Sequence, residues 1–398
     1  MAAEVLSLVS QLETAIQKVP KSEWDTQDAA IRRQASDTLR KLSLDLEDWG
    51  DLVDRVIYSP MDNVMIRLAL DLGIFDIITA HTGPVDVETI VNEVGVADET
   101  LLRRILRTLD AMNAIGAIRE DGYEATNYTR AFTTQKGIAG QRFSFEFCAP
   151  AWNQIPYFLA KGGYRNPSNA LDTPLQMAFN SQSHFFGLLQ ERPGMLETFG
   201  TFMTCHKKGR PEFPEIYPVE RELVDGLSDN EDAVLLVDVG GGLGQDISTL
   251  RHTVPTLRGR TILQELPEMV RSFPGTEGIE IMEYDFFKPQ KVKGARAYYF
   301  RNIFHDWSDE NCIKILESTK SAMIPGYSKI LINDLVVTQQ KEGLFMTRSD
   351  MNMLALLGSM EHSEKQWHEL MEKAGLVIVK MWTKEARYES IIEVMLPV

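Results

Sequence analysis

The sequence predicts an α/β protein with a doubly wound sheet in its C-terminal part and a mainly helical N-terminal part. Three observations predict this class. Apolar strand-like runs alternate with helical segments after about residue 226, the pattern of a parallel sheet covered by helices on both faces. One of these runs leads directly into a glycine-rich loop. Nearer the start, three helical segments precede a short hairpin signal.

Length and charge limit the classes of function. The 398 residues exceed the size at which a single core usually stops growing, so two or more domains are expected. The net charge of −16 opposes binding to a phosphate backbone. Cys148, Cys205 and Cys312 are too few for a disulfide framework and lack metal-ligand spacing. We therefore expect a protein that binds no nucleic acid and no metal. Because we find no basic leader and no bilayer-length apolar stretch, we also expect it to be cytoplasmic and not bound to a membrane.

Residues 1 to about 60 form an expected helical arm. Apolar residues such as Leu6, Val9, Leu12 and Ile16 recur at helical spacing, so these helices need a partner surface to cover them. We therefore expect a homodimer with the arm in its interface.

The arm leads into an expected winged helix. Its helices are expected at 64–78, 85–94 and 98–114, with Asp98 as a cap, and its hairpin at 115–124 around Glu120-Asp121-Gly122. Such a module binds DNA in many proteins. The acidic net charge favours the other interpretation, a dimerisation domain over residues 1–130.

Residues 131–225 are expected to be helical and to link the two domains. They are rich in aromatic residues, which favours plain core and leaves open an apolar wall for a substrate pocket. The aromatic residues are Phe143, Phe145, Phe147, Trp152, Phe158, Phe179, Phe185, Phe186, Phe199 and Phe202. The run Gly209-Arg210-Pro211 marks the approach to the next domain.

The third segment, 226–398, is the expected sheet domain of the Rossmann-like type. Its strands are expected at 234–239, 260–265, 279–285, 295–304, 328–336 and 376–382. The last run, 390–396, follows after a short turn and is expected to be an antiparallel edge strand.

The loop Gly240-Gly241-Gly242-Leu243-Gly244 predicts a ligand site at the carboxyl end of its strand. Glycine permits close backbone approach, and the following helix offers free N–H groups. A dinucleotide-binding fingerprint requires glycine at the position that Gln245 occupies. Asp238 precedes the loop, so a cationic or amino-bearing ligand is favoured over a pyrophosphate.

Two further strand ends carry acids suited to a nucleoside. Glu265 ends the second strand, where a carboxylate can accept hydrogen bonds from both hydroxyls of a ribose. Asp285 and Phe286 end the third, where an acid and an aromatic ring can hold and stack an adenine.

The segment from Tyr299 to Glu310 presents His305 and Asp306 together after an apolar strand. A histidine there can accept a proton near neutral pH. The other histidines have no comparable context.

Together these motifs resemble the S-adenosylmethionine-dependent O-methyltransferases of the caffeate type, particularly their fungal secondary-metabolism branch. The resemblance covers nearly the whole chain and implies a class I methyltransferase domain with S-adenosylmethionine as cofactor. It implies cofactor binding by Asp238, Gly240, Gly242, Glu265, Asp285, Phe286 and Arg301. It also implies that His305 is the general base and that Asp334 and Glu361 orient it. Asp334 is a methylene shorter than the glutamate that is usual there.

Two enzyme functions follow from the resemblance. The first is methyl transfer to a hydroxyl of an aromatic or polyketide-derived small molecule, with Trp152, Asn352 and Met353 shaping the cavity. The alternative is a pericyclase or dehydratase of the same family, which keeps the sulfonium as a fixed charge and acts on a polyketide-derived, pyridone-like substrate. In that case Arg301 and Asn302 are placed to polarise a carbonyl. A DNA-binding regulator, the third hypothesis, depends on the winged helix alone.

Overall fold

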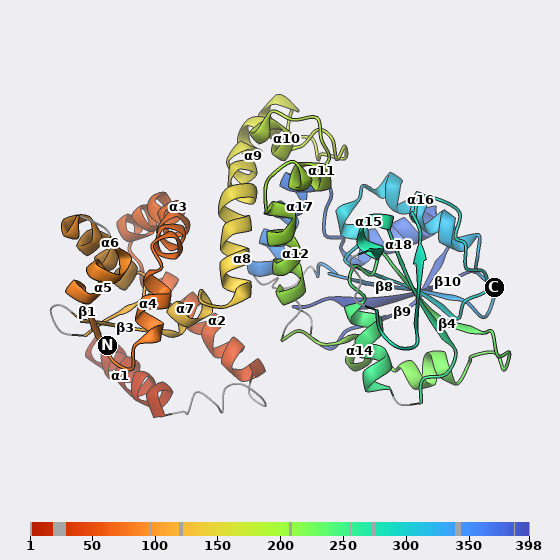
Figure 1. The fold of residues 1–398 in the computed structure, drawn as a ribbon, viewed down its shortest axis with the longest axis horizontal. Coiled ribbons are helices and arrows are strands. Elements are labelled where there is room, and N and C mark those ends of the chain that lie inside the picture. The colour runs from red at the N-terminus through yellow and green to blue at the C-terminus, as the bar shows by residue number, and fades with distance from the viewer. Residues whose placement is uncertain are drawn as a thin grey trace.

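The computed structural model describes residues 2–18, 29–95, 98–118, 122–206, 209–254, 256–271, 275–338, 344–385 and 387–397. Figure 1 shows the N-terminal helices on the left, a column of long helices in the middle and a twisted sheet on the right. The predicted class, a helical winged-helix domain followed by a Rossmann-like sheet domain, is confirmed.

The arm consists of α1 (Ala2–Lys18), α2 (Ala29–Leu46) and α3 (Trp49–Asp71). Asp48 caps α3, because its carboxylate accepts hydrogen bonds from the N–H groups of Gly50 and Asp51. The arm leaves many large apolar side chains exposed. On α1 these are Val5, Leu6, Leu8, Val9, Leu12 and Ile16, and on α3 they are Trp49, Leu52, Val53, Val56, Ile57, Tyr58, Met61 and Val64.

The winged-helix part has its own small core and a three-stranded sheet in the order β1-β3-β2. Its elements are α4 (Ile74–Ala80), β1 (Val85–Asp86), α5 (Val87–Val94), α6 (Glu99–Ala111), β2 (Gly116–Ile118), β3 (Gly122–Glu124) and α7 (Asn127–Ala131). The Asp98 cap is confirmed, since its carboxylate accepts from the N–H of Leu101 at 3.0 Å. The helix expected at 64–78 is interrupted, because Gly73 adopts a left-handed φ of 65°. The hairpin turn lies partly outside the described residues.

The middle column contains α8 (Gln135–Phe143), a π-helical turn (Ser144–Cys148), α9 (Ala149–Lys161), α10 (Pro174–Phe179), α11 (Phe185–Gln190) and α12 (Met195–His206). Its aromatic rings pack face to edge, for example Phe147 on Phe185 with centroids 5.5 Å apart. A helix from much later in the chain, α17 (Leu344–Leu357), packs into the same core (Figure 1). The column therefore joins two segments of the chain that the sequence does not show to be neighbours.

The seven-stranded sheet has the order β6-β5-β4-β7-β8-β10-β9. Its strands are β4 (Val234–Val239), β5 (Arg260–Glu265), β6 (Ile279–Glu283), β7 (Ala297–Arg301), β8 (Lys329–Asp334), β9 (Val377–Trp382) and β10 (Ser390–Met395). The first five are parallel. Tyr298 and Tyr299 belong to different core clusters, as expected for side chains that alternate between the two covered faces.

The remaining helices cover the sheet and its edges. They are α13 (Phe213–Ile216), a π-helical turn (Glu220–Val224), α14 (Gln245–Thr253), α15 (Pro267–Val270), the 3₁₀ turn η4 (Phe304–Asp306), α16 (Asp309–Lys320) and α18 (Glu364–Lys373).

Two strand predictions need correction. The run at 390–396 is antiparallel but is not an edge strand, because β10 lies between β8 and β9 and is buried along most of its length, whereas β9 forms the partly exposed edge. The strand expected at 295–304 ends at Arg301, because Asn302 takes a left-handed φ of 51° and turns the chain into η4.

Candidate active site

The loop after β4 lies at the carboxyl edge of the sheet and requires its glycines. Gly240, Gly242 and Gly244 have φ of 69°, 59° and 66°, a region that side-chain-bearing residues rarely occupy. A Cβ on Gly241 would lie 2.5 Å from Cγ of Asp238 and 2.6 Å from Cδ1 of Leu263. The backbone therefore passes close to buried Asp238 before α14 begins.

Glu265, at the end of β5, is tied to this loop. Its Oε1 accepts from the N–H of Gly242 at 3.1 Å, and its Oε2 accepts from the N–H of Leu266 at 2.6 Å. Burial raises the pKa of Glu265, although these two donors oppose the shift. Gly242 and Glu265 thus lie side by side at neighbouring strand ends.

Asp285 and Phe286 follow β6. The carboxylate of Asp285 accepts from the N–H of Phe287 at 2.9 Å. The Phe286 ring lies 3.6 Å from where a Cβ on Gly240 would stand, and it packs edge to face on Trp307. The structure therefore brings Asp238, Gly240, Gly242, Glu265 and Phe286 around one loop, with Asp285 adjoining.

Arg301 ends β7 and reaches the first turn of α14. Its Nη1 donates to Oδ1 and Oδ2 of Asp246 at 3.0 and 3.1 Å. Burial disfavours its charge, but Asp246 raises the pKa of Arg301 above its ordinary value. Arg301 thus anchors the helix that follows the glycine loop.

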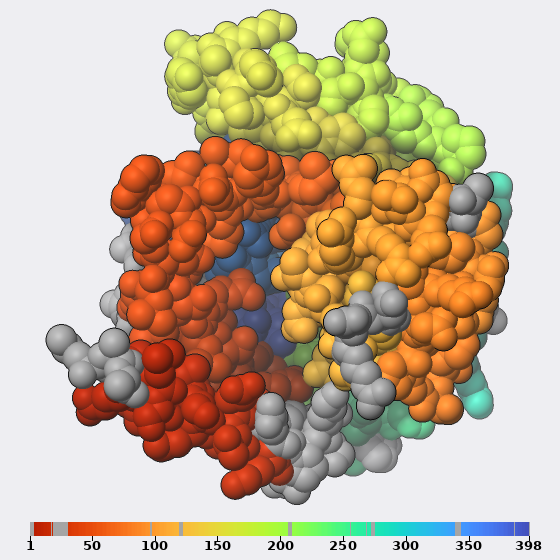
Figure 2. Space-filling model, turned by 90° about the vertical axis from the view of Figure 1, so that its left-hand side faces the viewer, coloured from red at the N-terminus to blue at the C-terminus, as the bar shows by residue number. Residues whose placement is uncertain are grey.

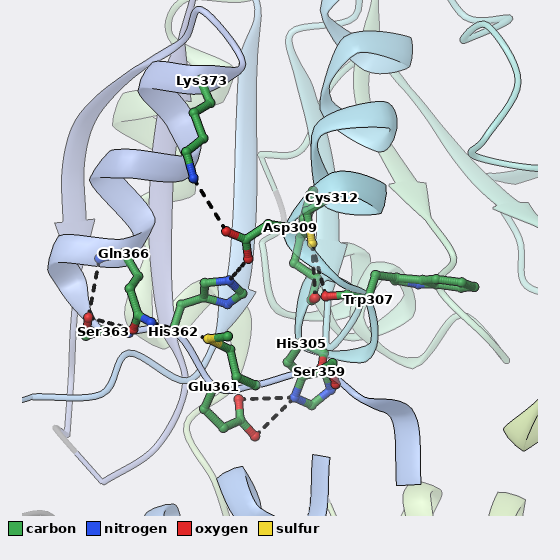
Figure 3. A network of polar contacts seen from close by, with 12 residues as sticks. His305, Trp307, Asp309, Cys312, Ser359, Glu361, His362, Ser363, Gln366 and Lys373 are labelled. Carbon is green, nitrogen blue, oxygen red and sulfur yellow. Dashed lines mark hydrogen bonds and ion pairs between the residues drawn. The ribbon is translucent and has the colours of Figure 1, made fainter. Parts of the chain in front are cut away.

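His305 lies in η4, beyond the turn at Asn302, rather than on a strand. Its Nδ1 lies 3.3 Å from both carboxylate oxygens of Glu361 (Figure 3). Its Nε2 lies 3.6 Å from Oδ1 of Asp306. Its backbone carbonyl accepts from the hydroxyl of Ser359 at 2.5 Å. The segment that carries Ser359 and Glu361 lies much later in the chain than η4, and it holds His305 in place.

Glu361 is itself held from several sides. The hydroxyl of Ser349 donates to its Oε1 at 2.9 Å, and its own N–H donates to Asp350 Oδ1 at 2.9 Å. The next residue, His362, contacts Asp309 through Nε2 at 3.1 Å, as Figure 3 shows beside the His305 pair. The carboxylate that faces His305 is therefore fixed by both α17 and α16.

The charges around His305 determine its protonation. Burial alone would lower the pKa of His305, but the carboxylates of Glu361, Asp306 and Asp334 raise it well above its usual value. Burial would raise the pKa of Glu361, but His305 and Ser349 keep it below its ordinary value. Burial raises the pKa of Asp306 to about 6. The two shifts run in opposite directions, and both favour an imidazolium–carboxylate pair.

Asp334 ends β8 and is fully buried. Within the part of the chain that the structure describes, neither of its carboxylate oxygens has a hydrogen-bond partner. Burial raises the pKa of Asp334 to about 7, although His305 opposes the shift. Glu361 thus contacts the imidazole directly, whereas Asp334 acts on it only through its charge.

A cavity of about 450 Å³ opens beside His305. Asn302, His305, Glu361, Asn352 and Met353 line it. Four phenylalanines of the middle column, Phe143, Phe185, Phe199 and Phe202, form an aromatic wall, so these residues serve both as core and as pocket. Trp152 is not among the lining residues, but its Nε1 donates to Asn352 Oδ1 at 2.8 Å and so positions that amide.

Sequence reasoning did not assign four charged lining residues to the site: Arg40, Arg210, Arg348 and Glu389. They come from the arm, a linker, α17 and the residue before β10, and no local pattern connects them. Asp306 also lines the cavity, next to His305 as its place in the sequence suggested. Searched over its described ranges, the chain contains no cluster of three or more acidic, histidine or cysteine residues that could hold a metal ion. In the same ranges, every helix is too short or too polar to cross a membrane.

Fold and site together define an α/β domain of enzyme type, with a glycine loop at the carboxyl edge of its sheet and a histidine–carboxylate pair beside a cavity. Models of known families identify it further: residues 220–377 match an O-methyltransferase domain, and residues 56–135 match an O-methyltransferase dimerisation domain. The chain belongs to the O-methyltransferase family.

Similar proteins of full length support this assignment. The methyltransferase cfoC of Aspergillus candidus is 34% identical over 98% of both chains. Demethylsterigmatocystin 6-O-methyltransferase of Aspergillus flavus is 33% identical over 96% of this chain and 97% of its own. A solved structure described as a pericyclic reaction enzyme is 29% identical with a TM-score of 0.89, covering 98% of this chain and 100% of its own. A complex of LepI with SAM is 29% identical with a TM-score of 0.87, covering 100% of both chains.

Proposed function

We propose that the protein transfers a methyl group from S-adenosylmethionine to a hydroxyl of an aromatic or polyketide-derived secondary metabolite, with His305 as the general base. One observation carries this proposal: His305 lines the cavity while its Nδ1 is held by Glu361. The 33% identity to an enzyme named as a 6-O-methyltransferase supports the reaction type.

The residues at the carboxyl edge of the sheet fit the methyl donor. The left-handed Gly240 and Gly242 let a ligand approach the backbone, and Asp238, Glu265, Asp285 and Phe286 supply acids and a ring around it. Arg301 supports this site through Asp246 at the start of α14. When bound, S-adenosylmethionine supplies an electrophilic methyl group on a sulfonium. The LepI complex with SAM supports this assignment.

The chain's own residues position the substrate and take its proton. A phenol with a pKa of about 10 is a poor nucleophile until it loses its proton. Glu361 on Nδ1 orients the imidazole and leaves Nε2 as the atom that accepts the hydroxyl proton. The deprotonated form of His305 is the reactive one, and the resulting imidazolium is stabilised by Glu361 and by the charge of Asp334.

The cavity favours a flat, largely apolar substrate. The phenylalanine wall takes an aromatic body, while Asn302, Asn352 and Met353 line the rest of the cavity and Trp152 fixes Asn352. Figure 2 shows the N-terminal face hollowed between the arm and the following helices, with C-terminal residues in blue inside the hollow.

A second function, the pericyclase or dehydratase, is supported by the protonation of His305. An imidazolium donates a hydrogen bond and polarises a carbonyl without accepting a proton. In this function Asn302, which lines the cavity, would lie beside the substrate, and the sulfonium of a bound cofactor would supply a fixed positive charge. The likeness to a pericyclic reaction enzyme at 29% identity supports it too.

The proposal includes a homodimer formed through the N-terminal helices. The exposed apolar side chains of α1 and α3 form a surface that a single chain leaves in water, which usually marks an interface. The match to a dimerisation domain over 56–135 includes part of this surface. The three segments 1–130, 131–225 and 226–398 then serve dimerisation, substrate enclosure and catalysis.

A labelled methyl group decides between the two functions. Purified protein is incubated with methyl-labelled S-adenosylmethionine and a small-molecule extract, and products are analysed by mass spectrometry. Label in an organic product, with an equal amount of S-adenosylhomocysteine, supports methyl transfer. Conversion of an unsaturated compound without either species would overturn methyl transfer and favour the second function.

A further inference from the structure

Three arginines line the cavity beside His305, and they come from three separate parts of the chain: Arg40 on α2, Arg210 in the linker before α13, and Arg348 on α17. Arg210 is nearly buried and is ion-paired with the equally buried Glu389. Its guanidinium also lies 5.2 Å from the ring centroid of Phe345. The charge of Arg210 is therefore balanced within the protein.

Arg40 and Arg348 differ from Arg210. Both side chains are exposed, and the described residues offer neither of them a hydrogen-bond or ion-pair partner. A guanidinium keeps its charge at all accessible pH values and presents its donors in a planar fork. Within the described ranges, two guanidiniums without an ionic partner thus line the same cavity as the phenylalanine wall.

The carboxylates of the cavity do not neutralise these two cations. Glu361 faces His305, and Glu389 faces Arg210. Asp306 lies beside Nε2 of His305. Each of the three described acids on the wall is therefore paired with another group.

Both cations line the cavity that His305 lines, and Arg348 adjoins the reaction centre along the chain. Arg348 directly precedes Ser349, whose hydroxyl donates to Glu361 at 2.9 Å. Consecutive Cα atoms lie about 3.8 Å apart, so Arg348 adjoins a residue that is hydrogen-bonded to the carboxylate partner of His305. Asn352 and Met353 line the cavity from the next turn of the same helix. On α2, Arg33 is ion-paired with Glu385 at 2.6 Å, and Arg40 lies two turns later on the same face.

We infer that the substrate carries a carboxylate on an aromatic body, which Arg348 and Arg40 bind at the cavity mouth while its hydroxyl faces His305. The inference rests on the proposed function and adds the substrate class. The aromatic wall accounts for the ring, and the two guanidiniums account for an anionic group, since fork-shaped hydrogen bonding suits a carboxylate better than a neutral carbonyl.

A matched pair of probes tests this by calorimetry. 1-Hydroxy-2-naphthoate and its methyl ester are titrated into the full-length protein, with and without saturating S-adenosylhomocysteine. We expect the carboxylate to bind about tenfold more tightly than the ester. The preference should shrink as salt is raised, because both arginines are exposed. A carboxylate that binds no more tightly than the ester overturns the inference.

Variants show which arginines cause the preference for the carboxylate probe over its ester. Arg348→Gln and Arg40→Gln should each weaken carboxylate binding several-fold and leave ester binding unchanged, and Arg348→Lys should retain part of the preference. Arg104→Gln, an exposed arginine on α6 outside the cavity, is the control and should change neither affinity. An undiminished preference in both cavity variants would contradict the assignment. Failure of the proposed function would instead appear as absent S-adenosylhomocysteine binding or absent methylated product, and the probe comparison can be read without either.

Discussion

Both carboxylate oxygens of Glu361 lie 3.3 Å from Nδ1 of His305, although the two residues are far apart in the sequence. The contact places a buried negative charge on one side of the imidazole and leaves the other nitrogen toward Asp306 and the cavity.

The substitution His305→Gln should reduce methyl transfer by about 10²- to 10⁴-fold, because among the described lining residues His305 is the one histidine and the proposed base. Affinity for S-adenosylhomocysteine should remain within about twofold, since His305 does not belong to the glycine-loop site. Turnover is followed by mass spectrometry and affinity by calorimetry. His81→Gln, at an exposed helix end, should leave both unchanged. Full turnover in His305→Gln would refute the base assignment.

Methyl transfer should increase with pH above neutrality. The raised pKa of His305 keeps the imidazole protonated at pH 7, so the proportion able to accept a proton grows as the pH rises toward that pKa. A plot of kcat/KM against pH should rise with a slope approaching one. In Glu361→Gln the rise should move to lower pH, because the largest of the charges that raise the pKa of His305 is gone. The control Glu369→Gln, at an exposed position, should not move it. An identical profile in Glu361→Gln would argue against the pair.

The substitution Asp334→Asn should stabilise the protein at pH 8. The folded-state pKa of about 7 lies above the ordinary value of 3.8, so wild-type stability is lost as the pH rises from about 4 to about 7. The asparagine side chain of the variant cannot ionise, so at pH 8 the free energy of unfolding of the variant should exceed that of the wild type by up to about 4 kcal/mol for a pKa shift of this size. Thermal unfolding at pH 4.5 and pH 8 measures it, with little difference expected at the lower pH. A variant less stable than wild type at pH 8 would contradict this account.

The substitution Gly241→Ala should weaken cofactor binding and lower the midpoint of thermal unfolding. Its Cβ would stand 2.5 Å from Asp238 and 2.6 Å from Leu263, so the loop or the strand ends must shift. Gly200→Ala is a matched control within α12, where a Cβ meets nothing within 4 Å. That control should gain about 0.5–1 kcal/mol from helix propensity. Unchanged affinity in Gly241→Ala would place the cofactor away from this loop.

The arm should hold two copies of the chain together. Trp49→Asp and Ile57→Asp place charges on α3 side chains that are 84% and 61% exposed in one chain, so a single chain tolerates them while a buried interface does not. Light scattering after gel filtration should show the dimer converting to monomer in the double variant. Lys365→Asp, an exposed position on α18 of the sheet domain, is the control. A persistent dimer in the double variant would exclude α3 from the interface.

Local patterns predicted much of the fold and part of the site. The buried run of β4 followed by the glycine loop, and the acid at the end of β5, are signals within a few residues, and the structure brings them together. The edge position expected for β10 was wrong because strand order depends on which neighbour covers the strand's hydrogen-bonding edge, and only the folded sheet determines that. The end of β7 was missed because the left-handed Asn302 has no strong local signature.

By itself, the sequence determined the elements, the two-part architecture and the residue types available for chemistry, because periodicity, glycine loops and strand-end polar residues act over short distances. The tertiary structure decided which charges meet. It placed Glu361 on Nδ1 of His305, left Asp334 buried beyond hydrogen-bond reach, and brought Arg40 and Arg348 to one cavity from opposite ends of the chain. These contacts depend on packing between distant segments, so no local pattern encodes them.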